Sequence, residues 1–298
     1  MKRVLLALTW IFTATLITSA QTTFYYPHVV NGVLGSVIWK TTILLTNPAS
    51  SGTVSGTISF MQDTAPPSGQ RDAANLALAG TPLTLTLTDE AGATATQSSF
   101  TFSIAPGGAK KLVSTGTGQF AAGFATVNAN SGMVSGTAIF SEYDAAGNLI
   151  GEAGVPSAAG LGRQAIFVDT VGGYNIGVAY SNTGPSTANI TLTLLDSRPV
   201  TVASTTQVLG PGNHNSLFTF QLFPAAPQLT GTMQITSNSP LASVALRFDP
   251  SFSKFTTLPA VTLASLINPA VEWLQERPWL TPLTSIARLL GSLQLRIG

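Results

Sequence analysis

The first residues in this sequence that could support catalysis are its two histidines, His28 and His214. A Ser–His–Asp triad is defined by geometry and not by sequence position, so His214 could act with Asp196 or Asp249. However, the sequence contains no Gly-x-Ser-x-Gly nucleophile elbow. His214 also follows Gly-Pro-Gly-Asn, which is a turn sequence. We therefore expect His214 to be a solvated turn residue, and a hydrolase is the least favoured function.

Carboxylates are the second possible source of chemistry, because a glycosidase uses two acids about 5–10 Å apart. The glutamates of the strand-rich region are Glu90, Glu142 and Glu152. Asp89-Glu90 precedes Ala-Gly, which is typical of a hairpin turn. Four aspartates end predicted strands at repeated positions: Asp63, Asp144, Asp196 and Asp249. We expect these side chains to accept backbone N–H groups of their own turns and not to act in catalysis.

Metal and cofactor sites have no support in the sequence. The chain has no cysteine, and it has no His-x-x-x-His pair and no Asp-x-Asp-x-Asp-Gly loop. A phosphate-binding Gly-x-x-x-x-Gly-Lys-Ser/Thr loop is also missing. The formal net charge is +1 without a basic cluster, so nucleic acid is not an expected partner. The sequence therefore predicts no metal, no cofactor and no nucleic-acid ligand.

Aromatic side chains could form a platform for sugar rings, although most aromatic residues serve as core anchors. The candidates are Tyr25, Tyr26, Trp39, Tyr174 and Tyr180. Trp39 and Tyr174 occupy matching positions in an internal repeat described below, which favours a shared core role. Tyr25 and Tyr26 lie near the predicted mature N-terminus, and they are the remaining candidates for ligand binding.

The N-terminus has the layout of a secretory signal peptide. Lys2 and Arg3 precede an apolar run over residues 4–17, and small residues follow at 18–20. The run is too short to cross a bilayer, which takes about 20 apolar residues. We expect residues 1–20 to be removed, with an uncleaved anchor as the alternative. Because exported eukaryotic proteins usually carry disulfides, the lack of cysteine favours a bacterial exported protein.

Alternating apolar and polar residues predict strands along most of the chain. Residues 82–88, 190–194 and 233–236 place Leu, Ile or Met on one face and mainly Thr on the other. Hydrophobic residues make up 44% of the chain and charged residues only 8%, so a large core is expected beneath a surface of Thr, Ser, Asn and Gln. Turn sequences separate the strands, and this pattern predicts an all-β fold.

An internal repeat divides the strand-rich region. Trp39 precedes Asn47 by eight positions, as Tyr174 precedes Asn182. Further landmarks recur in one order: Pro106-Gly107-Gly108, Gly123, Asn130 and Tyr143-Asp144 in the first copy, and Pro211-Gly212-Asn213, Gly231, Asn238 and Phe248-Asp249 in the second. The first copy has additional residues between Asp63 and Phe100. Such a repeat indicates two copies of one structural unit.

We therefore predict two β-sandwich domains, at residues 21–160 and 161–263, with an insertion near 64–99 in the first. Small uncharged residues at 155–162 are typical of a linker. Residues 264–298 carry two Pro-initiated segments with helical spacing of apolar residues. They predict a short helical or loosely ordered tail, which either packs on the second domain or makes the only membrane contact of the chain.

Several of these landmarks resemble exported proteins of environmental bacteria. Residues 24–32, Trp39 and Asn47-Pro48 are similar to their opening unit. Residues 173–182, 236–240 and 246–248 are similar to their closing unit. Those proteins look like tandem immunoglobulin-like sandwich chains of uncharacterised function. The resemblance implies an immunoglobulin-like fold and export, and it transfers no catalytic residue.

Three functions follow from these patterns. The favoured one is a non-catalytic secreted or cell-envelope protein with a structural, adhesive or surface-display role. The second is a carbohydrate-binding module, which requires an exposed aromatic or polar cluster in one domain, most plausibly in the insertion at 64–99. A hydrolase is the third. The expected partner is an extracellular protein or a glycan.

Overall fold

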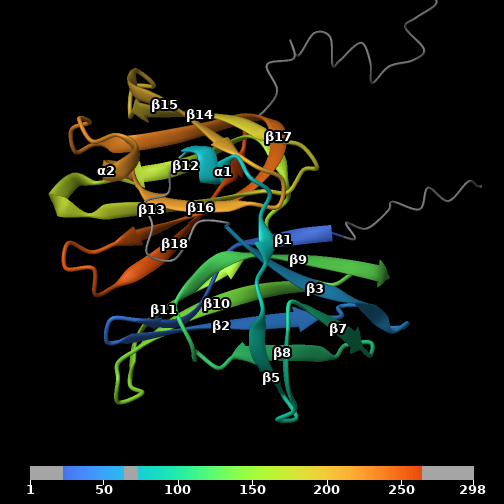
Figure 1. Cartoon of the computed structure of the whole chain (residues 1–298). Coiled ribbons are helices and arrows are strands. Elements are labelled where there is room, and N and C mark those ends of the chain that lie inside the picture. The colour runs from blue at the N-terminus through green and yellow to red at the C-terminus, as the bar shows by residue number, and fades with distance from the viewer. Residues whose placement is uncertain (1–22, 64–72, 264–298) are drawn as a thin grey trace, which may run out of the picture. The chain divides into compact units, whose positions relative to one another are not determined.

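The computed structural model describes residues 23–63 and 73–263, and these residues form an all-β protein, as the sequence predicts (Figure 1). Its helical segments are α1 (Ala73–Leu76), α2 (Thr219–Leu222) and the 3-10 turn η1 (Val171–Gly173). The predicted signal peptide and the predicted C-terminal tail lie outside the described residues. None of the helices in the described part of the chain has the length and apolar character needed to cross a bilayer.

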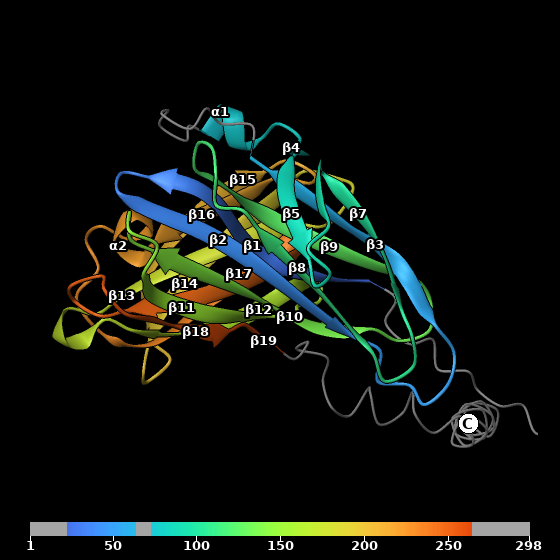
Figure 2. The same cartoon turned by 90° about the horizontal axis from the view of Figure 1, so that it is seen from below.

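The first half of the described chain contains eleven strands. They are β1 (Thr23–Leu34), β2 (Val37–Thr46), β3 (Val54–Gln62), β4 (Thr81–Pro82), β5 (Leu85–Asp89), β6 (Thr94–Gln97), β7 (Ser99–Ile104), β8 (Ala109–Ser114), β9 (Ala121–Ser131), β10 (Ser135–Tyr143) and β11 (Leu149–Pro156). Antiparallel pairing orders one layer as β7-β3-β9-β1 and the other as β11-β10-β2-β8-β5-β6. In Figure 2 the blue β2 lies beside the green β10. The inward faces of both layers form one buried core.

The second half repeats this arrangement with fewer strands. They are β12 (Leu161–Asp169), β13 (Asn175–Asn182), β14 (Ala188–Asp196), β15 (Thr201–Leu209), β16 (His214–Phe218), β17 (Thr230–Phe248), β18 (Phe255–Pro259) and β19 (Val261–Thr262). The long β17 takes part in both layers, because its first part pairs with β12 and β14 and its last part with β13 and β18. β15 completes the first layer and β16 the second. Thus the single strand β17 takes the positions in the two layers that β9 and β10 take in the first half.

The hydrogen bonds of Asn47 show how each copy of the repeat is fixed. Asn47 is buried at the end of β2, and its Nδ2 atom donates to the carbonyls of Gly52 at 2.9 Å and Ile104 at 3.0 Å. Its Oδ1 atom accepts the N–H of Ala49 at 3.1 Å. One side chain therefore forms hydrogen bonds with backbone groups of two loops, where regular secondary structure supplies no partner for these groups.

Asn182 makes the same connections at the end of β13. Its Nδ2 atom donates to the carbonyls of Ser186 at 2.7 Å and Leu209 at 2.9 Å. Its Oδ1 atom accepts the N–H of Gly184 and the hydroxyl of Ser239, both at 3.0 Å. The internal repeat seen in the sequence is therefore a repeat of structure, down to individual side-chain hydrogen bonds.

The insertion in the first half is described from residue 73 onward. Its segment around α1 lies against the second half, as Figure 1 shows. The Nδ2 atom of the buried Asn213 donates to the carbonyls of Leu76 at 3.1 Å and Leu78 at 2.9 Å. Leu76 is itself part of the second core. The insertion thus acts as a strap between the halves, which its local sequence did not reveal.

Glycines allow this strap to approach the second half closely. A Cβ atom on Gly80 would lie 1.9 Å from the carbonyl oxygen of Gly212, and one on Gly210 would lie 1.9 Å from that of Leu78. Neither position has room for a side chain. The contact is therefore made by backbone against backbone.

The described residues up to Val261 form one compact unit. Strand pairing changes from the first sheet to the second between Pro156 and Leu161, but the first core also includes Ala179, Val244 and Leu246 from the second half. The two halves therefore share apolar contacts. Independent folding of two domains with a boundary at 160 stays a prediction.

Candidate functional site

The main candidate site is a cavity of about 380 Å³ where the second half covers one end of the first core. We call it the junction cavity. Apolar residues dominate its lining, including Trp39, Phe120, Phe218, Phe248 and Phe252. The polar side chains in the lining are few: His28, Glu142, Ser216 and Gln221. Small-molecule sites have this size and this mixture of apolar walls with a few polar groups.

Strand alternation places Trp39 and Glu142 beside one another in the cavity. Glu142 lies two residues beyond the buried Phe140 on β10, so it continues that strand's inward-facing row. On β2, Trp39 continues the inward row that contains Ile43. Glu142 and Trp39 are directly paired across the two strands. A carboxylate and an indole ring therefore share the inward face at the end of the first core.

The electrostatics of this pair are unusual for a core position. Burial raises the pKa of the Glu142 carboxyl above its usual range. Among the described residues, Glu142 has neither a hydrogen bond nor an ion pair, and the buried indole Nε1 of Trp39 has no hydrogen-bond acceptor. Buried polar atoms normally have partners, so the Trp39 N–H has unused hydrogen-bonding capacity beside the half-buried Glu142 carboxylate.

A continuous cluster of aromatic rings connects the two halves around the cavity. Its ring-centroid distances are Trp39–Phe120 6.3 Å, Trp39–Phe140 6.2 Å, Phe140–Phe255 5.3 Å, Phe248–Phe255 5.3 Å, Phe218–Phe248 5.4 Å and Phe218–Phe252 5.5 Å. These spacings are typical of attractive ring contacts. Sequence reasoning missed this cluster, because its members come from separate strands and turns of both copies. The only available signal was the density of phenylalanine between residues 248 and 255.

The two histidines meet at the edge of the cavity. His28 Nδ1 lies 3.1 Å from His214 Nε2, and the rings stack with their centroids 5.3 Å apart. His214 is completely buried as the first residue of β16, so the expectation of a solvated turn histidine is wrong. The Gly-Pro-Gly-Asn turn ends one residue earlier, and the strand carries His214 toward the first half.

The carboxylates considered for a triad belong to their own turns. Asp196 accepts the backbone N–H groups of Arg198 at 2.8 Å and Val200 at 3.0 Å. Asp249 accepts those of Ser253 at 2.8 Å and Lys254 at 2.9 Å. Hydrogen bonds, chiefly from Ser251, lower the pKa of Asp249 to about 2.

Asp144 has the same role, since it accepts the N–H groups of Ala146 at 2.9 Å and Asn148 at 2.8 Å. The predicted turn role of these strand-end aspartates is confirmed for Asp144, Asp196 and Asp249. The three carboxylates and His214 lie on separate elements of the fold.

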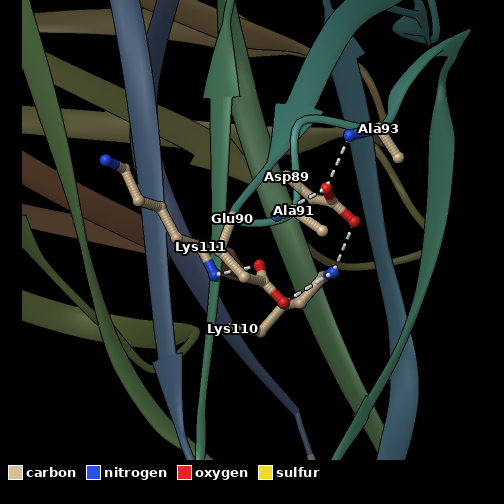
Figure 3. A network of polar contacts seen from close by, with 6 residues as sticks. All are labelled: Asp89, Glu90, Ala91, Ala93, Lys110 and Lys111. Atoms are coloured by element: carbon tan, nitrogen blue, oxygen red, sulfur yellow. Dashed lines mark hydrogen bonds and ion pairs between the residues drawn. The ribbon is translucent and has the colours of Figure 1, made fainter.

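The Asp89-Glu90 pair forms the predicted hairpin turn between β5 and β6 and is also anchored to β8 (Figure 3). Lys110 Nζ lies 2.9 Å from Asp89 and 3.0 Å from Glu90. The hydrogen bond from Lys110 is the main reason that the pKa of Asp89 is lowered. Glu152 in turn accepts a hydrogen bond from Ser141 at 3.2 Å. Of the three glutamates considered for a glycosidase, only Glu142 lines the junction cavity.

The second half has a smaller cavity of about 170 Å³, and Tyr174 lines it. The Arg247 guanidinium lies over the Tyr174 ring at 3.4 Å and forms a 2.7 Å ion pair with Asp169. This hydrogen bond from Arg247 is the main cause of the lowered pKa of Asp169. Trp39 and Tyr174 were predicted to share a core role. Both are half-buried: Trp39 packs against the first core and lines the junction cavity, whereas Tyr174 lines the smaller cavity.

The two tyrosines predicted as ligand contacts lie on opposite faces of β1. Tyr26 is fully buried in the first core, and burial raises the pKa of its phenol. Tyr25 is half-buried, and its backbone pairs with Ala158. Neither residue lines the junction cavity. A ligand role for Tyr25 and Tyr26 stays a prediction, and for Tyr26 it would require the core to open.

In the described part of the chain, no group of three His, Asp or Glu side chains is placed to hold a metal ion. No protein-family model matches the sequence, and no curated protein matches it. Among solved structures, the apo form of a Pleurotus ostreatus lectin matches with a TM-score of 0.23 and 11% identity, covering 83% of this chain and 84% of that one. A lectin from Pleurotus ostreatus in complex with GalNAc matches with a TM-score of 0.16 and 10% identity, covering 77% and 80%. At these TM-scores neither likeness carries an argument about this chain.

Proposed function

We propose that this chain is an exported, non-catalytic binding protein of the cell envelope or extracellular space, built from two immunoglobulin-like sandwich units. The junction cavity is its ligand site. The observation that carries this proposal is a cavity of about 380 Å³ whose aromatic walls come from both halves. A cavity of this size with few convergent polar groups is the default position for a ligand.

The polar groups of the cavity favour binding over catalysis. Glu142 is the one carboxylate in its described lining, whereas glycoside hydrolysis uses two. His28 is held by a second histidine, at 3.1 Å from His214. The groups present can orient a ligand, and the aromatic rings can exclude water around it.

An adhesive or structural role in an exposed location is supported by the outward faces of the strands. Threonine hydroxyls bond across neighbouring strands, as between Thr86 and Thr96 at 2.8 Å and between Thr88 and Thr94 at 3.1 Å. Such ladders solvate the surface with few charges and stabilise strand pairing. They suit a secreted protein without disulfides. The N-terminal sequence also predicts secretion.

The proposal is tested by a small-molecule screen using ligand-observed NMR on the mature chain. Ala122 lines the cavity from β9, so Ala122→Trp would fill it. Ala95 is exposed on β6 outside the cavity, so Ala95→Trp is the matched control. Compounds that bind wild type and Ala95→Trp but not a folded Ala122→Trp support the proposal. Compounds that bind all three equally, or no binding at all, contradict it.

Carbohydrate binding is the second candidate, and the Phe252 ring favours it. Phe252 lines the cavity with 43% of its surface exposed, so its ring is accessible to the apolar face of a sugar. A glycan array with wild type and Phe252→Ala tests this candidate. A glycan bound by wild type and lost in Phe252→Ala supports it, and an array without binding contradicts it.

A further inference from the structure

The second half shows how this fold holds a cation. The Arg247 guanidinium lies between the Tyr174 ring, at 3.4 Å, and the Asp169 carboxylate, at 2.7 Å. An aromatic face and a carboxylate together replace the water that a buried cation would lose. The cation at this site is therefore a side chain of the protein itself, and the ring and the carboxylate that contact it are also its own.

The first half places an aromatic ring beside a carboxylate without a cation. Trp39 stands eight residues before Asn47, as Tyr174 stands before Asn182. In the strand registers Glu142 pairs directly with Trp39, whereas Arg247 pairs with Ile176 and its carboxylate partner Asp169 lies on β12. The two corners therefore share types of side chain and not equivalent strand positions.

No side chain of the described residues supplies the missing positive charge to Glu142. Lys40, next to Trp39 on β2, points to the other face, where it lies 5.0 Å from the Tyr143 ring. Glu152 on the adjacent β11 is bound to Ser141. The remaining titratable group in the cavity lining is His28, which is paired with His214.

We propose that the junction cavity binds a small organic cation, whose ammonium group lies between the Trp39 ring and the Glu142 carboxylate. This inference rests on the proposed function, because it assigns a ligand class to the same cavity. The apolar part of the ligand packs against Phe120, Phe248 and Phe252. A metal ion fits poorly, since one carboxylate among aromatic rings lacks the several oxygen ligands that hard cations require.

A matched pair of probes separates charge from shape. Choline and neohexyl alcohol differ by replacement of the quaternary nitrogen with carbon, so they are nearly identical in size. Calorimetric titration of the mature chain should show choline binding at least about tenfold more tightly, because only the cation interacts with the carboxylate and the ring quadrupole. Equal affinity for the two probes would overturn the assignment of a cationic ligand.

Two variants locate the effect within the cavity. Glu142→Gln removes the charge and keeps the shape, and it should reduce the preference for choline to the contribution of the Trp39 ring while leaving neohexyl alcohol within about twofold. Glu152→Gln removes a neighbouring carboxylate outside the cavity lining and should leave the preference unchanged. A choline preference that is undiminished in Glu142→Gln overturns the inference.

The outcomes also separate this inference from the proposed function. If the ligand screen finds compounds blocked by Ala122→Trp and choline does not bind, the cavity is a binding site and only the cation assignment fails. If neither probe binds and the screen finds no compound blocked by Ala122→Trp, both proposals fail.

Discussion

The two halves of this protein share the hydrogen bonds of one loop but differ in the charged groups near it. Asn47 and Asn182 organise equivalent loops through nearly the same hydrogen bonds. Eight residues before each asparagine, however, Trp39 lies beside a carboxylate without a partner among the described residues, whereas Tyr174 lies beneath a paired guanidinium. The comparison teaches that the two copies share the hydrogen bonds of their loops but differ in the charged groups beside the aromatic ring.

Replacing the asparagines tests the shared part of the comparison and should have the largest effect. Asn182→Ala leaves two carbonyls and one N–H of buried loops without their partner, and we expect a loss of about 4 kcal/mol. Asn47→Ala should cost about 3 kcal/mol, because Asn182 has one further bond, from Ser239. Urea unfolding measures both values. A loss below about 1 kcal/mol for either variant would contradict equivalent structural roles.

The strap is the largest feature that only the first half has. Gly80→Ala places a methyl group where a backbone oxygen stands 1.9 Å away, so we expect a loss of about 3 kcal/mol. In Gly154→Ala the new atom has its nearest neighbour at 3.9 Å, so this control should change stability little. Thermal unfolding of both variants provides the measurement. Equal melting temperatures would show that the strap is not tightly held.

The charged corners should respond in opposite directions. Arg247→Met removes the ion pair with Asp169 and the contact with Tyr174, and should cost about 2 kcal/mol. Glu142→Gln removes a carboxylate whose pKa is raised by burial, so it should leave stability unchanged or increase it at neutral pH. Destabilisation by Glu142→Gln as large as that by Arg247→Met would mean that Glu142 also has a stabilising partner within the protein.

The smallest effect is the pH dependence of these groups. Since the pKa of Glu142 is raised, its favourable contribution is present at acidic pH and is lost as the pH rises through the raised pKa. The advantage of Glu142→Gln over wild type should therefore grow from acidic to neutral pH.

Asp249 behaves in the opposite way. Its pKa of about 2 stabilises the fold above the usual carboxyl pKa, and this contribution is lost as the pH falls toward about 2. The melting temperatures of Asp249→Asn and wild type should therefore converge at the acidic end of this pH range. A difference in melting temperature that stays constant with pH would contradict the assigned turn role.

Local sequence patterns were sufficient for much of the fold. Alternation of Thr with Leu or Ile identified the strands, and the recurring Asn, Gly and Asp residues identified the repeat and the Asx turns, because both depend on near neighbours in the chain. The burial of His214, the strap around Leu76 and the aromatic cluster were not predictable in this way. Each depends on which face of one half lies against the other, and periodicity does not specify such contacts.

The candidate site was only partly visible for the same reason. Trp39 and Glu142 were both recognised as notable residues, but their pairing depends on the register between β2 and β10. Tyr25 and Tyr26 were predicted from their position near the predicted mature N-terminus, whereas the cavity lies at the junction. A search for inward-facing charges would have singled out Glu142 once β10 was aligned with its neighbours.

The most direct test follows the indole N–H signal of Trp39 by ¹H–¹⁵N NMR during titration with choline. The chain has four tryptophans, and Trp39→Phe assigns the signal. We predict a saturable shift of the Trp39 signal in wild type that needs a higher choline concentration in Glu142→Gln. A Trp39 signal that stays in place, or that shifts equally in both proteins, would contradict the account of an open cation-binding corner at the junction.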